Sequence, residues 1–86
     1  DNEISGEVIY EDSFGNLITN IPRDLIEGYS KIQIDEFIID SVAGSYQDVE
    51  KGEVLAIIGS SGFLEISVNN GSASDLIKDR RLRVLK

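Results

Sequence analysis

Two short segments of this 86-residue chain hold most of the side chains that are suited to recognise a ligand. The first is DSFGNLITN at residues 12–20, and the second is GSSGFLEISVNNGS at residues 59–72. Both place Asn, Asp or Ser beside glycines, which allow a backbone to approach a bound molecule closely. The pattern predicts a polar pocket that reads its ligand mainly through hydrogen bonds.

The first segment has two interpretations. Phe14-Gly15-Asn16 between two strands is typical of a tight turn, with Gly15 at positive φ, Asn16 bonded to the backbone and Phe14 in the core. Alternatively, the Asn16 amide carries a donor beside an acceptor and so matches the edge of a purine. In that case Asp12 accepts a hydrogen bond from a ligand ammonium or hydroxyl group.

The second segment also has two interpretations, a turn and a ligand-binding loop. Gly59-Ser60-Ser61-Gly62 separates the two most apolar strands, which is typical of a hairpin turn, but its hydroxyl and N–H groups are also suited to hold a carboxylate. It lacks the length, the lysine and the following helix of a P-loop, which argues against a nucleoside triphosphate. The backbone at Asn69 and Asn70 is expected to be free to read a base edge. Glu65 has apolar neighbours; it either faces solvent or fastens a loop through its carboxylate, and we favour structural support over a ligand contact.

Composition excludes several kinds of chemistry. The chain has no cysteine and no histidine. This excludes a disulfide framework, a thiolate nucleophile and a serine–histidine triad, and it argues against a zinc site. No two carboxylates have the relationship expected of a general acid and a general base. We therefore predict no catalytic residue, no metal and no cofactor in this chain.

The formal net charge is −8, from 16 acidic and 8 basic residues. Because phosphates and anionic headgroups prefer a basic surface, this charge argues against nucleic acid and membranes as partners. No apolar run is long enough to span a membrane and no signal-peptide pattern is present, so we predict a cytoplasmic location. The cations near the C-terminus form either a small anion patch or the solvated face of a terminal strand: Lys78, Arg80, Arg81, Arg83 and Lys86.

The elements that must position these segments are mostly strands. Apolar and polar side chains alternate at 4–10, 17–21 and 63–68, residues 54–58 are almost wholly apolar, and shorter β-rich stretches cover 31–34, 37–42 and 82–84. Residues 22–27 and 72–78 are expected to form short helical turns, with Asn20 as a cap and a capping box at Ser72. We predict a mainly β domain, a small antiparallel β-barrel or sandwich of six to seven strands with one or two short helical turns.

The order and spacing of these motifs resemble the C-terminal domain of the S-adenosylmethionine (SAM) hydroxide adenosyltransferases. These adenosine-forming SAM hydrolases are similar to the SAM-dependent fluorinases and chlorinases. The resemblance rests on GEVIY at 6–10, DSFGNLITNI at 12–21, YQDVEKGE at 46–53 and GSSGFLEISVNNGSA at 59–73. It implies that residues 1–86 are a single domain, the C-terminal substrate-binding β-barrel of a longer two-domain protein whose N-terminal α/β domain is absent from this sequence.

The resemblance also implies a function. The whole enzyme would hydrolyse SAM to adenosine and methionine as a homotrimer, with the substrate between one subunit's N-terminal domain and a neighbour's C-terminal barrel. The groups that activate water would lie in the N-terminal domain, so this domain alone would be inactive. Without the resemblance, two other functions fit the residues: a structural or trimerisation β-domain, and a stand-alone small-molecule binding module.

The resemblance assigns each predicted site residue to one end of the substrate. At the adenine end it places Asn16, Tyr46, Asn69 and Asn70. At the amino and carboxylate end of methionine it places Asp12, Ser60 and Ser61. Asn16 would hydrogen-bond the base and Tyr46 would pack on it. The chain departs from the halogenases at Ser61, where they have arginine, and in the spacing from Asp12 to Asn16, which is one residue shorter.

Overall fold

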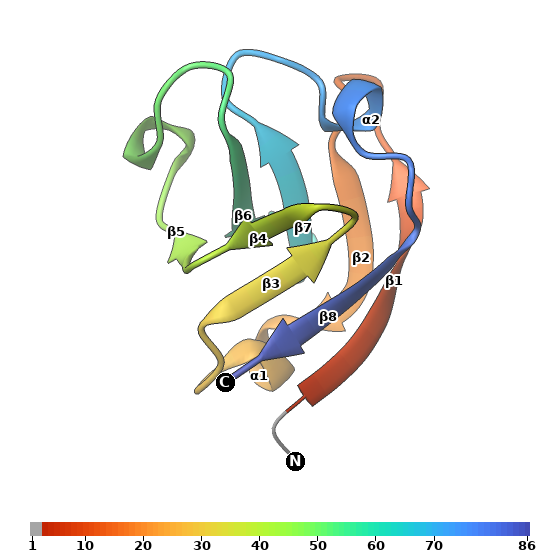
Figure 1. The fold of residues 1–86 in the computed structure, drawn as a ribbon, viewed down its shortest axis with the longest axis vertical. Helices are drawn as coiled ribbons and strands as arrows, with labels where there is room; N and C mark the ends of the chain where they lie inside the picture. Colours follow the sequence, from red (N-terminus) through yellow and green to blue (C-terminus); the bar gives the residue numbers. More distant parts are fainter. Residues whose placement is uncertain (1–2) are drawn as a thin grey trace.

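The structure, a computed structural model, is mainly β and describes residues 3–86 (Figure 1). The first two residues of the predicted 1–86 domain lie outside this range. The eight strands of the described residues are β1 (Glu3–Glu11), β2 (Leu17–Pro22), β3 (Lys31–Ile34), β4 (Phe37–Ile39), β5 (Val42–Ala43), β6 (Val54–Ile58), β7 (Phe63–Val68) and β8 (Arg81–Leu85). The helices of this range are α1 (Arg23–Ile26), the 3₁₀ turn η1 (Tyr46–Asp48) and α2 (Ala73–Leu76).

The strands form one sheet in the order β4-β3-β8-β1-β2-β7-β6-β5. The sheet curls until β4 lies beside β6, which gives a nearly closed barrel (Figure 1). Neighbouring strands are antiparallel except β5 and β6, where Val42 pairs with Ala56 in parallel. The predicted class of small β-barrel is confirmed. The strand count exceeds the prediction because the expected strand at 37–42 is divided into β4 and β5.

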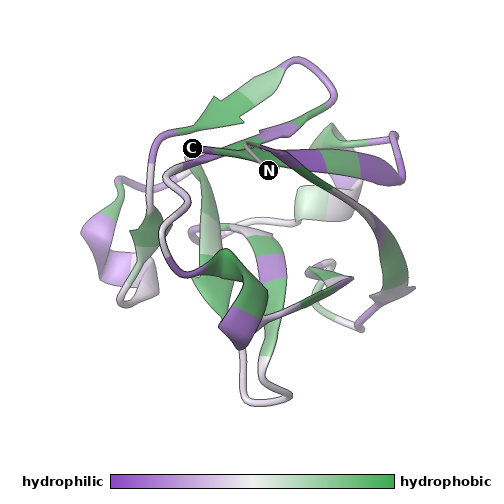
Figure 2. Cartoon of the chain, turned by 90° about the horizontal axis from the view of Figure 1, so that it is seen from below, coloured by the Kyte–Doolittle hydropathy of each residue, from purple (hydrophilic) through white to green (hydrophobic). Residues whose placement is uncertain are grey.

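Strand alternation builds the core. Leu17, Thr19 and Ile21 of β2 all point inward and are buried, as their spacing predicts. Figure 2 shows the same alternation as green and purple bands along the strands. The buried apolar cluster inside the barrel consists of Leu17, Ile21, Ile26, Ile32, Ile34, Ile39, Ala56, Leu64, Ile66, Val68, Ala73, Ile77, Leu82 and Val84.

The alternation of β1 is interrupted by a bulge. Val8 pairs with Thr19 but Tyr10 pairs with Ile18, so one extra residue is inserted in β1. The sequence pattern places Tyr10 on the same face as Val8, but this is wrong, since the bulge turns the Tyr10 side chain outward and leaves it 63% exposed. Tyr10 therefore joins Ile18 on the outside of the barrel.

The two predicted helical turns are present but shorter than expected, and their caps differ. Pro22 is the N-cap of α1, and the Asn20 Oδ1 atom instead accepts a hydrogen bond from the Glu7 N–H at 2.9 Å. Ser72 is the N-cap of α2, but its hydroxyl lies 3.0 Å from the Ser74 hydroxyl and makes no cap bond. The prediction of Asn20 as a cap is wrong, and Ser72 holds the predicted cap position without the bonds of a capping box, because both side chains have other partners. No helix within residues 3–86 is long and apolar enough to cross a membrane.

Candidate functional site

The turn between β1 and β2 closes around the Asp12 carboxylate. Its Oδ1 atom accepts hydrogen bonds from the backbone N–H groups of Phe14 and Asn16, each at 2.9 Å, and its Oδ2 atom accepts one from Asn16 Nδ2 at 3.0 Å. Gly15 has φ +85°, as the turn interpretation predicts. The Asn16 Oδ1 atom has no hydrogen bond within residues 3–86, so one acceptor of this amide is available to a ligand.

These contacts set the charge and shape of the turn. Burial raises the pKa of Asp12, but hydrogen bonds from Asn16, Phe14 and Gly15 outweigh it, so the net pKa lies below its usual value. The ionised carboxylate therefore stabilises the turn until the pH falls through this lowered pKa. The expectation that Phe14 lies in the core is wrong. Its N–H points into the turn, and its side chain is 77% exposed.

The two polar segments meet where Gly15 packs on Ser72. A Cβ atom on Gly15 would lie 2.7 Å from Ser72 Cβ and 3.1 Å from Ser72 Cα. The Ser74 N–H donates a hydrogen bond of 2.9 Å to the Gly15 carbonyl. The β1–β2 turn and α2 accordingly lie together at the upper end of the barrel in Figure 1. This contact joins Asn16 to the segment that follows β7.

Asn69 ties the loop that carries Tyr46 to the same end of the barrel. Its side chain Nδ2 donates to the Val49 carbonyl at 2.9 Å, and its backbone N–H donates to the Glu53 carbonyl at 3.0 Å. Tyr46 is exposed in η1 on this loop. Because the Asn69 N–H is engaged, the predicted backbone contact with a base is left to Asn70. Asn70 is exposed with φ 61° and makes no backbone hydrogen bond within residues 3–86.

Ser60 and Ser61 lie at the opposite end of β7, in its hairpin with β6. The hairpin closes through hydrogen bonds from the Gly59 N–H to the Phe63 carbonyl and from the Gly62 N–H to the Gly59 carbonyl. Both serines are exposed, and Ser60 borders a hollow of about 350 Å³. From Phe63 to Val68 the strand advances roughly 17 Å. The predicted residues therefore form two groups, one at each end of β7.

Between these two groups lies the outer surface of the sheet. We call it the outer face of β7 and define it by Glu65 of β7 and its paired neighbours, Ile18 of β2 and Ile57 of β6. Tyr10 pairs with Ile18, Ile18 with Glu65, and Glu65 with Ile57, so the four side chains form one row across β1, β2, β7 and β6. The core lies on the other face of β7, with Leu64, Ile66 and Val68. Glu65 is the acidic member of an otherwise apolar and aromatic row.

The Glu65 carboxylate makes no hydrogen bond or ion pair within residues 3–86, so the interpretation of Glu65 as a loop support is wrong. It rests on Gly59, where an added Cβ would overlap Glu65 Oε2 and Cδ. Burial raises the pKa of Glu65, and the negative charge of Asp12 raises it further. The sequence signal for a ligand contact at Glu65 is its position as a single acid within an apolar strand.

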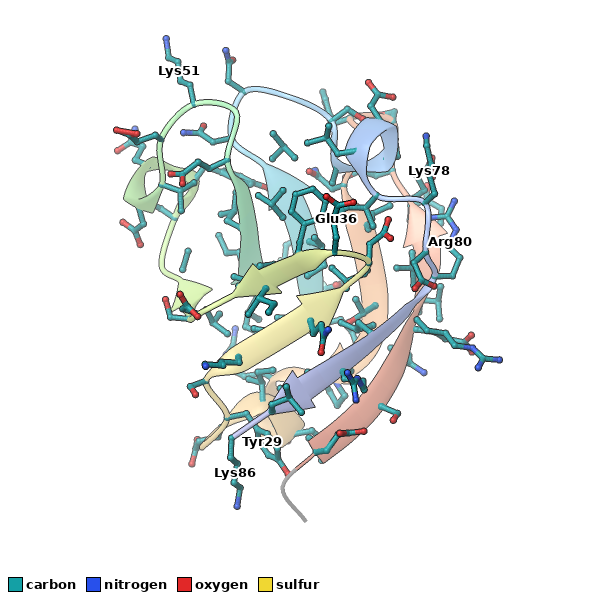
Figure 3. All side chains as sticks on the ribbon, in the orientation of Figure 1. Tyr29, Glu36, Lys51, Lys78, Arg80 and Lys86 are labelled. Atoms are coloured by element: carbon teal, nitrogen blue, oxygen red, sulfur yellow. The ribbon has the colours of Figure 1, made fainter. Side chains whose placement is uncertain are left out.

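Two of the five C-terminal cations, Arg81 and Arg83, lie on the exposed face of β8, whereas Lys78 and Arg80 precede this strand and Lys86 follows it. Arg80 pairs with Glu11 at 3.1 Å, and Lys86 Nζ lies 5.4 Å from the centre of the Tyr29 ring (Figure 3). Arg81 and Arg83 border a hollow of about 630 Å³ over β1, β8 and β3, which contains no predicted site residue. Within residues 3–86, no three His, Cys, Asp or Glu side chains converge as a metal site requires.

The sequence motifs have a match among known families. A sequence model described as the SAM hydroxide adenosyltransferase C-terminal domain matches residues 6–82. The chain belongs to this family.

Relatives of this SAM hydroxide adenosyltransferase domain are longer proteins. Two are named "(R)-S-adenosyl-L-methionine hydrolase". The protein from Thermus thermophilus is 35% identical over 72 residues, which cover 84% of this chain and 27% of that protein. The protein from Methanocaldococcus jannaschii is 36% identical over 86 residues, which cover 88% of this chain and 32% of that protein. The domain thus spans between a quarter and a third of their length.

Solved structures share the fold of this domain. A conserved uncharacterised protein from Thermotoga maritima has a TM-score of 0.81 and 34% identity, over 100% of this chain and 37% of its own. A conserved hypothetical protein from Thermus thermophilus has a TM-score of 0.80 and 31% identity, over 95% of this chain and 34% of its own. The barrel is therefore shared with longer chains.

Two buried hydroxyl groups of the domain differ in whether they have a hydrogen-bond partner, and this difference should appear in the stability of the domain. The Thr19 hydroxyl donates to the Leu64 carbonyl at 2.7 Å and accepts from the Ile21 N–H at 3.2 Å. The Ser67 hydroxyl, also fully buried, has no partner within residues 3–86. A buried hydroxyl without a partner opposes folding, whereas a bonded one supports it.

We expect Ser67→Ala to leave the free energy of unfolding unchanged or to raise it by about 1 kcal/mol, because no hydrogen bond is lost. Thr19→Val should lower it by about 1–3 kcal/mol, because Leu64 and Ile21 lose their partner. Urea unfolding of both variants in the full-length protein measures the difference. A larger loss in Ser67→Ala than in Thr19→Val would show that the Ser67 hydroxyl is bonded.

Proposed function

We propose that this chain is the substrate-binding barrel of an enzyme that hydrolyses SAM to adenosine and L-methionine. Two relatives that match this domain are named as hydrolases of this substrate, and the matched part makes up between a quarter and a third of their length. The chain itself offers no general acid–base pair and no histidine. The bond-breaking groups are therefore assigned to the remaining part of the full-length protein.

The observation that carries the proposal is the meeting of the two polar segments at Gly15 and Ser72. This contact joins the turn that carries Asn16, with its free Oδ1 acceptor, to the segment that follows Asn70 at one end of β7. An exocyclic amine of a purine can donate to that acceptor, and the Asn70 backbone can reach a second edge atom. The base is thus held through polar groups of both segments, and Tyr46 lies on the loop beside them.

The other end of the substrate extends along the outer face of β7. A path of roughly 17 Å leads from the Asn16 end to the hairpin of Ser60 and Ser61. Exposed hydroxyl and N–H groups there are suited to a carboxylate. This direction places the ribose and the sulfonium over the middle of the strand. Water adds to the ribose 5′ carbon, the bond from that carbon to sulfur breaks with its electrons going to the methionine thioether, and one proton is released.

We further propose that the N-terminal domain of a neighbouring subunit closes this face in a homotrimer. Large apolar side chains are exposed beside the site, at Ile9, Tyr10, Phe14 and Leu76. Exposed apolar groups gathered at one place are typical of an interaction surface. A second domain that packs on them would exclude water from a substrate held on an otherwise open face. A cytoplasmic location stays a prediction.

The full-length protein tests this function directly. Incubated with SAM and a chelator, it is expected to release adenosine and methionine in equal amounts, and the isolated 86-residue chain is expected to release neither. Addition of chloride separates water from halide as the nucleophile, because a halide would yield a 5′-halogenated nucleoside. Failure of the full-length protein to consume SAM would contradict the proposal.

A further inference from the structure

Asp12, the acid that the resemblance places at the amino group of the substrate, is occupied by its own turn. Both of its carboxylate oxygens accept hydrogen bonds, from Phe14 and Asn16. A ligand ammonium would have to compete with these three donors or share their oxygens. Removal of Asp12 from the turn would also release Asn16, which holds the other end of the substrate. The structure therefore gives Asp12 a positioning role.

Glu65 has the opposite character. It is half-buried on the outer face of β7, and its carboxylate has no hydrogen bond or ion pair within residues 3–86. Its neighbours in the row are Ile18 of β2 and Ile57 of β6, which offer no donor, and Tyr10 lies beyond Ile18 on β1. The charged group that acts on it is Asp12, which has the same sign. A cation is the group that would relieve both burial and repulsion.

The position of the carboxylate indicates which cation it binds. It packs on the Cα atom of Gly59, and Ser60 and Ser61 follow Gly59 directly. In an amino acid the α-ammonium and the carboxylate are attached to one carbon, so the protein groups that bind them must be neighbours. Glu65 lies next to the serine hairpin, whereas Asp12 lies in the turn that holds Asn16. We propose that Glu65, rather than Asp12, binds the α-ammonium group of the amino-acid end of the substrate.

A second polar side chain without a partner lies on the same side of β7. Ser67 follows Glu65 by two residues and points to the same side of β7. Its hydroxyl is fully buried and without a partner within the described residues. Two successive polar side chains of one strand face are thus unsatisfied, between the Asn16 turn and the serine hairpin. Ser67 is sealed from solvent, whereas Glu65 is only partly buried, so Glu65 is the one of the two that a polar ligand can reach.

The assignment of Glu65 to the ammonium group rests on the proposed function. Binding of three ligands distinguishes a failure of the assignment from a failure of the proposed function. SAM carries a sulfonium and an ammonium, S-adenosylhomocysteine carries the ammonium alone, and 5′-methylthioadenosine carries neither. Calorimetric titration of the full-length protein measures the dissociation constants of S-adenosylhomocysteine and 5′-methylthioadenosine, and initial rates give the KM for SAM, which the enzyme consumes. Glu65→Gln removes the charge with little change in volume, and Glu7→Gln is the matched control, because Glu7 is exposed on β1 away from the outer face of β7.

Glu65→Gln is expected to weaken SAM and S-adenosylhomocysteine at least tenfold, on the scale of about one charged hydrogen bond. Binding of 5′-methylthioadenosine should stay within about twofold, and Glu7→Gln should leave all three constants within about the same range, because neither comparison involves the bond. A loss confined to SAM would assign Glu65 to the sulfonium and overturn the proposal, as would unchanged binding or an equal loss for all three ligands. If the wild-type protein bound none of the three, the proposed function itself would fail.

The stability of the unliganded protein gives a second readout. Because the pKa of Glu65 is raised in the folded state, its ionised form opposes folding above that pKa, and the penalty vanishes below the usual pKa of a glutamate. Glu65→Gln should therefore raise the melting temperature at neutral pH, and this gain should disappear in acid. A lowered melting temperature at neutral pH would make Glu65 a structural residue and would overturn the proposal.

Discussion

Asn16→Ala is expected to raise the KM of the full-length enzyme for SAM by roughly 5- to 150-fold, which corresponds to the loss of one buried polar contact worth about 1–3 kcal/mol. The free Oδ1 atom of Asn16 is the acceptor that we assign to the purine, and alanine removes it. The base is distant from the bond that breaks, so binding should weaken while kcat changes little. Initial rates over a range of SAM concentrations separate the two constants.

Asn20→Ala is the matched control for this experiment. Asn20 lies in β2, four residues after Asn16, and its side chain also makes one hydrogen bond, from the Glu7 N–H, but it borders the hollow over β1, β8 and β3. Loss of one such bond should alter stability without altering KM. An unchanged KM in Asn16→Ala, or an equal rise in Asn20→Ala, would remove Asn16 from the adenine site.

Gly15→Ala is expected to lower the free energy of unfolding by about 2–5 kcal/mol. A side chain at φ +85° is strained by about 1–2 kcal/mol. The new Cβ would also press on Ser72, including its backbone Cα at 3.1 Å, and such overpacking costs about 1–3 kcal/mol. Any shift of the turn also moves Asn16, so KM should rise in the same variant.

Gly52→Ala isolates the first of these two effects. Gly52 has nearly the same φ, +86°, but no atom lies within 4 Å of an added Cβ. Gly52→Ala should therefore lower the free energy of unfolding by only about 1–2 kcal/mol and leave KM unchanged. Denaturant unfolding of both variants in the full-length protein provides the comparison. Equal losses would mean that Gly15 serves only the turn and that the contact with Ser72 is not important for the fold.

The parts of the fold that could be predicted from the sequence depend on local sequence patterns. The alternation in 17–21 and 63–68 predicted β2 and β7 together with their buried faces, because a strand alternates its side chains wherever it lies. The bulge at Ile9 and Tyr10 has no such local signal. It is set by pairing with Ile18, and the exposure of Tyr10 could not be predicted from the apolar character of its side chain.

The candidate site was predicted less completely. The polar segments themselves were evident in the sequence, since Gly beside Asn, Asp or Ser marks turns whose polar groups can also meet a ligand. Whether the Asp12 carboxylate bonds to its own turn or to a ligand depends on backbone geometry, and here it bonds to the turn. The contact of Gly15 with Ser72 joins residues that are far apart in the chain. Glu65 was interpreted as a support because an acid between apolar residues often binds a nearby loop.

A crystal structure of the full-length protein with adenosine and methionine tests the central claim most directly. We predict that the purine lies against Asn16 and Asn70, and that the methionine carboxylate lies at Ser60 and Ser61 with its ammonium at Glu65. Both products should lie along the outer face of β7. A nucleoside bound elsewhere, for example in the hollow beside Arg81 and Arg83, would contradict the account.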